Sequence, residues 1–187
     1  MTVAVFCASS EMIDDIFFQD AVKLGKEVGK RRWEVVYGGT RMGLMHCMAT
    51  SAQKAGSRII GIIPECIKQH GVAAEGLDEL IVTVDMQERK QMMRERADAF
   101  VALPGGWGTL EEIAEVITLR QLGCNVKPIV FVNTNGFYND FFMFLENIRK
   151  QGFISKVYDA LYYVAETVEE ALEYIDNYTP GKWESKY

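Results

Sequence analysis

The stretch AFVALPGGWGTLEE, residues 99–112, decides the fold of this protein. It begins with an apolar run that does not alternate with polar residues, and such runs are typical of strands covered on both faces of a sheet. A proline and three glycines follow, and two acidic residues lie in the segment after them. The stretch therefore predicts a buried strand, a tight glycine turn and a helix, which is the repeating unit of a parallel α/β sheet.

The same alternation of strand and helix extends along the 187 residues. Strands are predicted at residues 3–8, 34–39, 58–63, 79–84, 99–104, 128–133 and 161–165. Helices are predicted at residues 17–30, 42–55, 85–97, 109–122, 137–150 and 167–176. We expect a single domain over residues 1–187, with a Rossmann-like, doubly wound, mainly parallel sheet of about seven strands flanked by helices. In such a sheet, binding sites lie at the carboxyl ends of the strands.

The composition narrows the classes of function. The net charge of -6 argues against a nucleic-acid-binding surface, which needs clustered basic residues. No apolar run approaches the roughly 18 residues of a membrane-spanning helix, and the N-terminus lacks the pattern of an export signal. Four widely spaced cysteines without a CxxC pair predict neither a metal site nor a disulfide framework. We therefore expect a cytoplasmic protein without nucleic-acid or membrane partners.

Two predicted strands end in glycine-rich turns that lead directly into helices. The first turn lies in VVYGGTRMGLMHCMA, residues 35–49, and the second is PGGWGT, residues 104–109. Glycine lets the backbone turn sharply and approach a ligand, and the helix that follows offers unpaired N–H groups and a partial positive charge. Both turns therefore suit phosphate. The alternative is that these glycines form tight turns and nothing more.

Neither turn matches a standard nucleotide motif. Gly38 and Gly43 have the spacing of a P-loop, but Leu44 and Met45 stand where that motif requires lysine and serine or threonine. The second turn has Glu111 in place of the last glycine of the dinucleotide motif. A monophosphate is therefore a simpler ligand than ATP or NAD.

Charged side chains gather around the second turn. Thr109 and Glu112 have the spacing of a capping box, so a purely structural role for both is open. Glu111 points about 100° away from Glu112 around the helix, so the two carboxylates cannot share one role. Arg89, one turn into the predicted helix 85–97, lies at the same sheet edge as the second turn. A solvated helix face is the alternative for the charges of that helix.

These segments carry a family resemblance. With ERK at residues 88–90 and YGGTRMGLMHCMA at residues 37–49, the stretch PGGWGTLEE resembles the LOG (Lonely Guy) family of cytokinin riboside 5′-monophosphate phosphoribohydrolases, formerly labelled lysine decarboxylase-like. The similarity extends from VFCASS to QLGCNVKPIVFVNTNGFYND and covers nearly the whole chain. It implies hydrolysis of the N-glycosidic bond of a nucleoside 5′-monophosphate to free base and ribose 5-phosphate, without metal or organic cofactor. It also implies a homodimer whose site lies near the interface.

The resemblance also implies roles for particular residues. Arg89 and Glu112 are the implied catalytic pair. The predicted substrate-binding residues are Ser9, Gly38, Gly39, Lys90, Gly105, Gly106, Gly108, Thr109 and Thr118. Chemistry supports the glutamate independently, because cleavage of the glycosidic bond builds positive charge on the ribose, and a carboxylate stabilises that charge and positions the attacking water. Arg89 is expected to orient this carboxylate or the ribose hydroxyls and to help keep the carboxylate ionised.

Other ionisable residues are less informative. His46 and His70 are the only histidines, and neither falls at a matched catalytic position, so no proton donor for the leaving base is predicted. No lysine lies at a glycine turn or in a familiar pyridoxal phosphate context, which argues against the decarboxylase label.

The chain departs from the family pattern at four positions. Thr40 and His46 replace glycines of the first turn, and Ala8 replaces a glycine after the first strand. Gly71 stands where some relatives have a glutamate. We expect these changes to reshape the pocket, which leaves the recognised base open. The alternative function is a non-catalytic nucleotide or cofactor carrier of the same fold, resembling molybdenum-cofactor carriers, which would not need the arginine–glutamate pair.

The predicted helices 85–97 and 109–122 also carry more apolar residues than one helix face commonly buries, namely Met92, Met93, Ile113, Val116, Ile117 and Leu119. Most of them are predicted to be core, and the remainder to form a twofold interface.

Overall fold

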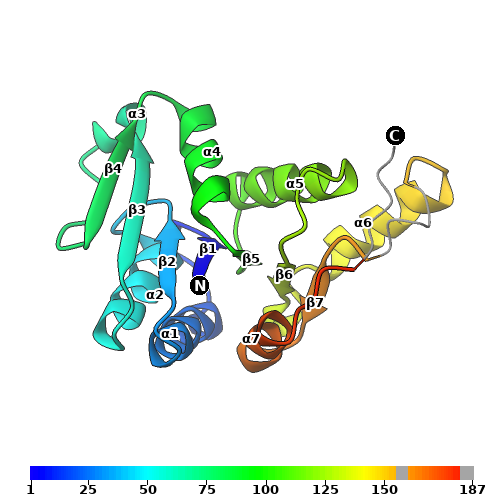
Figure 1. Ribbon diagram of the computed structural model, residues 1–187, viewed down its shortest axis with the longest axis horizontal. Helices are drawn as coiled ribbons and strands as arrows, with labels where there is room; N and C mark the ends of the chain where they lie inside the picture. Colours follow the sequence, from blue (N-terminus) through cyan, green and yellow to red (C-terminus); the bar gives the residue numbers. More distant parts are fainter. Residues whose placement is uncertain (155–159, 182–187) are drawn as a thin grey trace.

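The computed structural model describes residues 1–154 and 160–181, and these residues form one sheet of seven parallel strands (Figure 1). The strands are β1 (Thr2–Phe6), β2 (Glu34–Tyr37), β3 (Ile59–Pro64), β4 (Glu79–Thr83), β5 (Ala99–Ala102), β6 (Ile129–Val132) and β7 (Tyr163–Ala165). Their order in the sheet is β4-β3-β2-β1-β5-β6-β7. The central strand β1 pairs in parallel with β2 through Val3 and Val35, and with β5 through Val3 and Ala99. The predicted doubly wound α/β fold is confirmed.

Helices cover both faces of this sheet. They are α1 (Asp15–Lys30), α2 (Gly43–Lys54), α3 (Glu65–Lys68), α4 (Met86–Arg96), α5 (Trp107–Gln121), α6 (Asn139–Lys150) and α7 (Val168–Asp176), with the 3-10 helix η1 (Thr134–Gly136) before α6. α1, α2 and α7 pack on one face, and α4, α5 and α6 pack on the other (Figure 1). No helix within the described residues combines the length and the apolar character needed to cross a bilayer.

The two faces bury two separate cores. Val3 and Val5 of the central strand point into the core beneath α1, α2 and α7, whereas Ala4 and Phe6 point into the core beneath α4 and α5. Because both faces of the strand are covered, its interior is continuously apolar. The same double burial explains the unbroken apolar runs of β3, β5 and β6, whereas the edge strand β4 is partly exposed.

The chain builds the sheet outward from β1 in two directions. β2, β3 and β4 extend it on one side, and the chain then returns through α4 so that β5 pairs with the other edge of β1 (Figure 1). The strand order therefore reverses between β1 and β5, and a crevice forms outside the carboxyl ends of strands at such a switch point. The first glycine turn follows β2 and the second follows β5, so both turns lie at this edge.

Some predicted boundaries are wrong. Helix α5 begins at Trp107, two residues before the predicted start, because Gly106 occupies the N-cap position. Helix α6 begins at Asn139, two residues after the predicted start, because Phe137 and Tyr138 connect it to η1, and β7 has three residues where five were predicted. The four-residue helix α3 was not predicted, since it is too short to show helical periodicity.

Candidate active site

A cavity of about 370 Å³ lies at the carboxyl edge of the sheet, beside the switch point. It is lined by Cys7, Ala8, Ser9, Ser10, Gly38, Thr40, Met42, Met45, Ile67, Val72, Met86, Arg89, Gly106, Trp107, Gly108, Thr109 and Glu112. Seven of the predicted site residues therefore line one cavity, namely Ser9, Gly38, Arg89, Gly106, Gly108, Thr109 and Glu112. The other four, Gly39, Lys90, Gly105 and Thr118, do not line it.

Arg89 and Glu112 form a buried ion pair in the wall of this cavity. Arg89 lies in the first turn of α4, where the side chain of the N-cap residue Asp85 accepts a hydrogen bond from the N–H of Glu88 at 2.9 Å. The Arg89 Nε donates to the carbonyl oxygen of Ile62 at 3.0 Å, and Nη1 donates to Oε1 of Glu112. Both residues are only 4% exposed. Loss of either partner would leave an unpaired charge in the protein interior.

The third guanidinium nitrogen of Arg89, Nη2, has no hydrogen-bond partner among residues 1–154 and 160–181. It lies against Gly38, where an added Cβ atom would be 2.5 Å from Nη2. The first glycine turn therefore makes room for the arginine side chain. A free donor of Arg89 remains beside the cavity.

Burial and charge act in opposite directions on the acid of this pair. Burial raises the pKa of Glu112 above its ordinary value of 4.5, and the neighbouring Arg89 charge and hydrogen bond lower the pKa by a smaller amount. Cys7, which lines the same cavity, is a buried thiol whose pKa is raised first by burial and then by the negative charge of Glu112. The thiol is therefore neutral beside the carboxylate.

Lys90 lies outside the cavity lining, in an ion-pair network between α4 and α5. Its ammonium group contacts the carboxylate of Glu111 and lies 3.6 Å from that of Glu115, which in turn pairs with Arg94 at 2.7 Å. The predicted separation of Glu111 from Glu112 is confirmed, because each carboxylate meets a different cation. The alternative of a fully solvated α4 face is wrong, since Arg89 and Lys90 are both buried.

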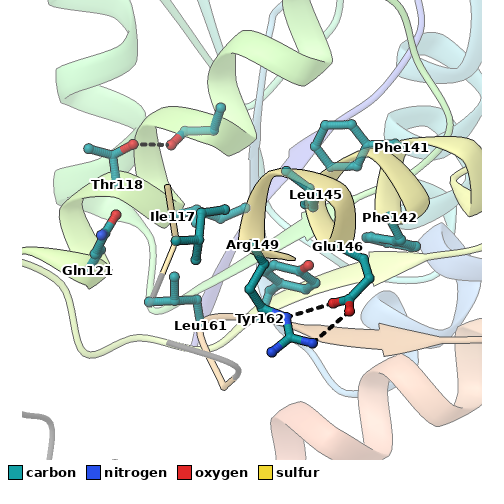
Figure 2. A pocket seen from close by; sticks show the side chains of 12 residues that line it. Ile117, Thr118, Gln121, Phe141, Phe142, Leu145, Glu146, Arg149, Leu161 and Tyr162 are labelled. Carbon is teal, nitrogen blue, oxygen red and sulfur yellow. Dashed lines mark hydrogen bonds and ion pairs between the residues drawn. The ribbon is translucent and has the colours of Figure 1, made fainter. Parts of the chain in front are cut away.

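Thr118 also lies away from this cavity. Its hydroxyl donates to the carbonyl oxygen of Ala114 at 2.8 Å, and both residues line a separate groove between α5 and α6 (Figure 2). The nucleotide contacts that the family resemblance implies for Thr118 and Lys90 stay predictions.

The second glycine turn leaves the N-terminus of α5 open. No side chain caps Gly106, so the predicted capping box is wrong; the Thr109 side chain packs on Gly105 instead, where an added Cβ would be 2.1 Å from its hydroxyl oxygen. The backbone N–H groups of Trp107, Gly108 and Thr109 find no acceptor among the described residues. An added Cβ at Gly106 or Gly108 would meet no atom within 4 Å. The three residues that carry these unpaired donors all line the cavity.

The first glycine turn is filled by the protein itself. The N–H groups of Leu44 and Met45, at the start of α2, donate to the carbonyl oxygen of Ala8 at 3.0 and 3.4 Å. Gly43 has a positive φ of 55°, and an added Cβ there would lie 2.5 Å from the carbonyl oxygen of Ser10. At Gly39, an added Cβ would lie 3.2 Å from the backbone nitrogen of Ile62. The equivalence of the two turns that the sequence predicted is therefore absent from the structure.

Residues that depart from the family pattern pack beside the first turn. The Thr40 hydroxyl donates to the sulfur of Met45 at 3.2 Å, and Thr40 also forms an antiparallel bridge with Ala73. The Arg41 guanidinium donates to the carbonyl oxygen of Gly71 at 3.0 Å. These contacts hold the loop after α3 against the first turn. His46 is exposed and does not line the cavity.

Sequence reasoning missed the apolar wall of the cavity, which consists of Met42, Met45, Ile67, Val72 and Met86. An apolar residue on a helix or loop has no sequence signal that distinguishes a cavity lining from an ordinary core contact. Only the packing of α2, α3, α4 and the loop after α3 at this sheet edge brings these side chains together.

The fold and this cavity define a Rossmann-like α/β protein whose candidate site combines an open helix N-terminus with a buried arginine–glutamate pair. A family model described as "Possible lysine decarboxylase" matches residues 45–175. The cytokinin riboside 5′-monophosphate phosphoribohydrolase LOG7 of Arabidopsis thaliana is 36% identical over 178 residues, which are 95% of this chain and 82% of the relative. The probable cytokinin riboside 5′-monophosphate phosphoribohydrolase LOGL2 of Oryza sativa subsp. japonica is 38% identical, over 95% of this chain and 73% of the relative. The chain belongs to the LOG family.

Solved structures share the fold. The molybdenum cofactor binding protein of Rippkaea orientalis superposes with a TM-score of 0.71 at 23% identity, over 94% of each chain. The Moco carrier protein of Chlamydomonas reinhardtii gives the same TM-score, identity and coverage. At this identity the likeness concerns the fold alone.

The words "lysine decarboxylase" in the family description imply pyridoxal phosphate, which forms a Schiff base with a lysine. Among residues 1–154 and 160–181 no lysine lines the cavity, and the nearby Lys90 ammonium is held by Glu111 and Glu115. The residues of this cavity therefore do not fit that cofactor.

Proposed function

We propose that this protein hydrolyses the N-glycosidic bond of a nucleoside 5′-monophosphate, a cytokinin riboside monophosphate or an AMP-like nucleotide, to free base and ribose 5-phosphate. The names of its curated relatives support the reaction class. The observation that carries the proposal is the buried Glu112, paired with Arg89 in the wall of a cavity that also contains the open N-terminus of α5.

The open helix terminus is the proposed phosphate site. Unpaired N–H groups and the helix dipole favour an anion at this position, and the phosphate accepts from the amides of Trp107, Gly108 and Thr109. With a rise of about 1.5 Å per residue, Glu112 lies roughly 5–7 Å along α5 from these amides. A ribose attached to the phosphate then extends past the carboxylate, which places the anomeric carbon near Glu112.

In the proposed reaction, the bond between the anomeric carbon and the base nitrogen breaks, and its electron pair leaves with the base. The carboxylate of Glu112 stabilises the oxocarbenium character of the ribose and accepts the proton of the attacking water. The new bond joins the water oxygen to the anomeric carbon. Arg89 holds the carboxylate in place through Nη1, and its unpartnered Nη2 donates to a ribose hydroxyl. The departing base takes its proton from solvent, since no histidine lines the cavity.

The homodimer is part of the same proposal. A groove of about 420 Å³ lies between α5 and α6, and Figure 2 shows Ile117 of α5 facing Leu145 of α6 across it. α6 carries several aromatic residues, yet none of its residues is buried in the single chain, and Met143 and Phe144 are more than half exposed. A second copy of the chain would cover this apolar surface. Sedimentation of Ile117→Glu beside the wild type tests it, with a monomer expected for the variant only.

A cytoplasmic location also remains our proposal, and the four free cysteines support a reducing compartment.

The test of the reaction is direct. The protein is incubated with AMP and with N6-isopentenyl-AMP, and free base and ribose 5-phosphate are quantified by chromatography. We expect both products in equal amounts, and we expect Glu112→Gln to lower kcat/KM by about 10²- to 10⁴-fold. Glu111→Gln is the matched control, because that neighbouring carboxylate is half exposed and lies outside the cavity lining.

Thermal unfolding of each variant establishes that it is folded. Turnover that persists in folded Glu112→Gln would contradict the assigned mechanism. Tight nucleotide binding with no product from any nucleotide would instead indicate a non-catalytic carrier.

A further inference from the structure

Trp107 is the first residue of α5 and is 89% exposed, although it is among the largest apolar side chains of the protein. It lines the cavity at the turn that we propose as the phosphate site. No aromatic ring or cation of the described residues contacts its indole. The side chain therefore contributes little to the folded core.

The surroundings of Trp107 leave space for a ligand. The residues on either side of it, Gly106 and Gly108, have no atom within 4 Å of where a Cβ would stand. Neither glycine has a positive φ, so the backbone conformation does not require glycine at these positions. Their missing side chains keep both flanks of the indole open at the mouth of the cavity.

Apolar residues form another part of the cavity wall, among them Ile67, Val72 and Met86. A phosphate has no favourable contact with such a wall, whereas the face of a planar aromatic group does. The lining thus has a polar part, at the α5 amides and the Arg89–Glu112 pair, and an apolar part that suits a heterocyclic base.

We propose that the indole of Trp107 stacks on the nucleobase of the bound nucleoside monophosphate and so acts as a specificity residue for aromatic bases. The proposal rests on the proposed function for the placement of the phosphate. With the phosphate on the amides of the first turn of α5, the exposed indole of Trp107 and the bound nucleotide share the mouth of one cavity, since Trp107 and Glu112 both line it. Stacking on an aromatic side chain is typically worth 1–3 kcal/mol per base and tolerates different bases, because every base has a π face.

The experiment compares two ligands that differ only in the base. Binding of AMP and of ribose 5-phosphate is measured by calorimetry in a Glu112→Gln background, which slows the consumption of AMP during the measurement. Trp107→Leu removes the ring and retains an apolar side chain, and Trp107→Phe keeps a smaller ring. We expect Trp107→Leu to weaken AMP binding about 5- to 150-fold, Trp107→Phe to restore part of that loss, and ribose 5-phosphate binding to stay within about twofold.

Indole fluorescence gives a second readout. Nucleotide should quench the emission of the wild type, and the quenching should disappear in Trp107→Phe, whereas Trp33→Phe should retain it because Trp33 is a buried core residue. An emission change that follows protein concentration rather than ligand would show that a second copy of the chain covers the indole, and would overturn the proposal. Equal losses for AMP and ribose 5-phosphate, or no loss of AMP binding, would overturn it too.

Failure of this proposal and failure of the proposed function give different results. If the wild type releases free base but Trp107→Leu binds AMP normally, the stacking role alone is wrong. If AMP binds in a Trp107-dependent manner but no base is released, the hydrolase assignment alone is wrong. If neither AMP nor ribose 5-phosphate binds, both are wrong.

Discussion

The two glycine turns look alike in sequence and differ in what fills them. Each follows a central strand, contains glycines and leads into a helix at the carboxyl edge of the sheet. At the start of α2, the amides of Leu44 and Met45 already donate to Ala8, whereas the amides that open α5 have no acceptor within the described chain. A helix N-terminus is therefore available to a ligand only where the rest of the protein leaves its donors unpaired.

The glycines of the two turns also serve different purposes. In the first turn, the missing side chains make room for the protein: Gly38 for the Arg89 guanidinium, and Gly43 for the backbone of Ser9 and Ser10. In the second turn, Gly106 and Gly108 face open space. The first turn therefore positions Arg89, a proposed catalytic residue, and the second leaves space for the proposed ligand.

The largest expected effect is on stability, from Gly43→Ala in the first turn. The new Cβ would enter a left-handed conformation, which costs about 1–2 kcal/mol, and would overlap the Ser10 carbonyl, which adds about 1–3 kcal/mol. Urea unfolding should show a loss of about 2–5 kcal/mol in the free energy of unfolding. A loss below about 1 kcal/mol would mean that the first turn relaxes around the new side chain. Glycine would then not be required at position 43, and the contrast between the two turns would be weaker.

Gly38→Ala should affect catalysis more than folding. Its Cβ would lie 2.5 Å from Nη2 at the end of the Arg89 side chain, so the guanidinium has to shift within the pair and no longer holds the Glu112 carboxylate in place. Misplacement of a catalytic group by about 1 Å costs on the order of 10²-fold in rate, so kcat/KM should fall by that factor. Steady-state kinetics beside a melting curve tests this, and unchanged kinetics would remove the proposed link between the first turn and the arginine.

Gly108→Ala should weaken binding without harming the fold. A Cβ in a helix tilts toward the amino end, so the new methyl group would project toward the proposed phosphate, while alanine favours the helix by about 0.5–1 kcal/mol over glycine. Ribose 5-phosphate binding measured by calorimetry should weaken about tenfold, the loss expected for one hydrogen bond to a charged group. Unaltered binding in a stable variant would place the phosphate elsewhere.

The smallest expected effect is a shift of the pH profile. Glu112 must be ionised to act, and its pKa is raised by burial, so kcat/KM should fall as the pH drops through a value above the ordinary 4.5. Arg89 lowers this pKa, so Gly38→Ala, which displaces the arginine, should move the acid limb to higher pH. Gly108→Ala should leave the acid limb in place, because it does not touch the pair. Coinciding acid limbs for Gly38→Ala and the wild type would contradict the assigned electrostatics.

Much of the candidate site could be predicted from the sequence. Arg89 and Glu112 were found because they follow strands whose carboxyl ends meet at one sheet edge, and because the surrounding segments resemble a known family. The predicted capping role of Thr109 is wrong because spacing alone does not reveal that Gly106 is the N-cap residue of α5. The sequence could not show that Lys90 lies outside the cavity, since its acidic partners Glu111 and Glu115 come from α5, and the nearer of them is 21 residues away in the chain.

The order of strands and helices, the parallel sheet and the edge at which a site forms can be predicted from the amino-acid sequence, because burial on both faces leaves continuous apolar runs and parallel strands end at a common edge. Which of the two similar turns is open, and which side chains line the cavity, depends on the folded chain. Both properties depend on groups that are distant in sequence. The carbonyl oxygen of Ala8 accepts from the first amides of α2, and the Arg89 side chain fills the space beside Gly38, whereas no such group reaches the first amides of α5 within the described chain.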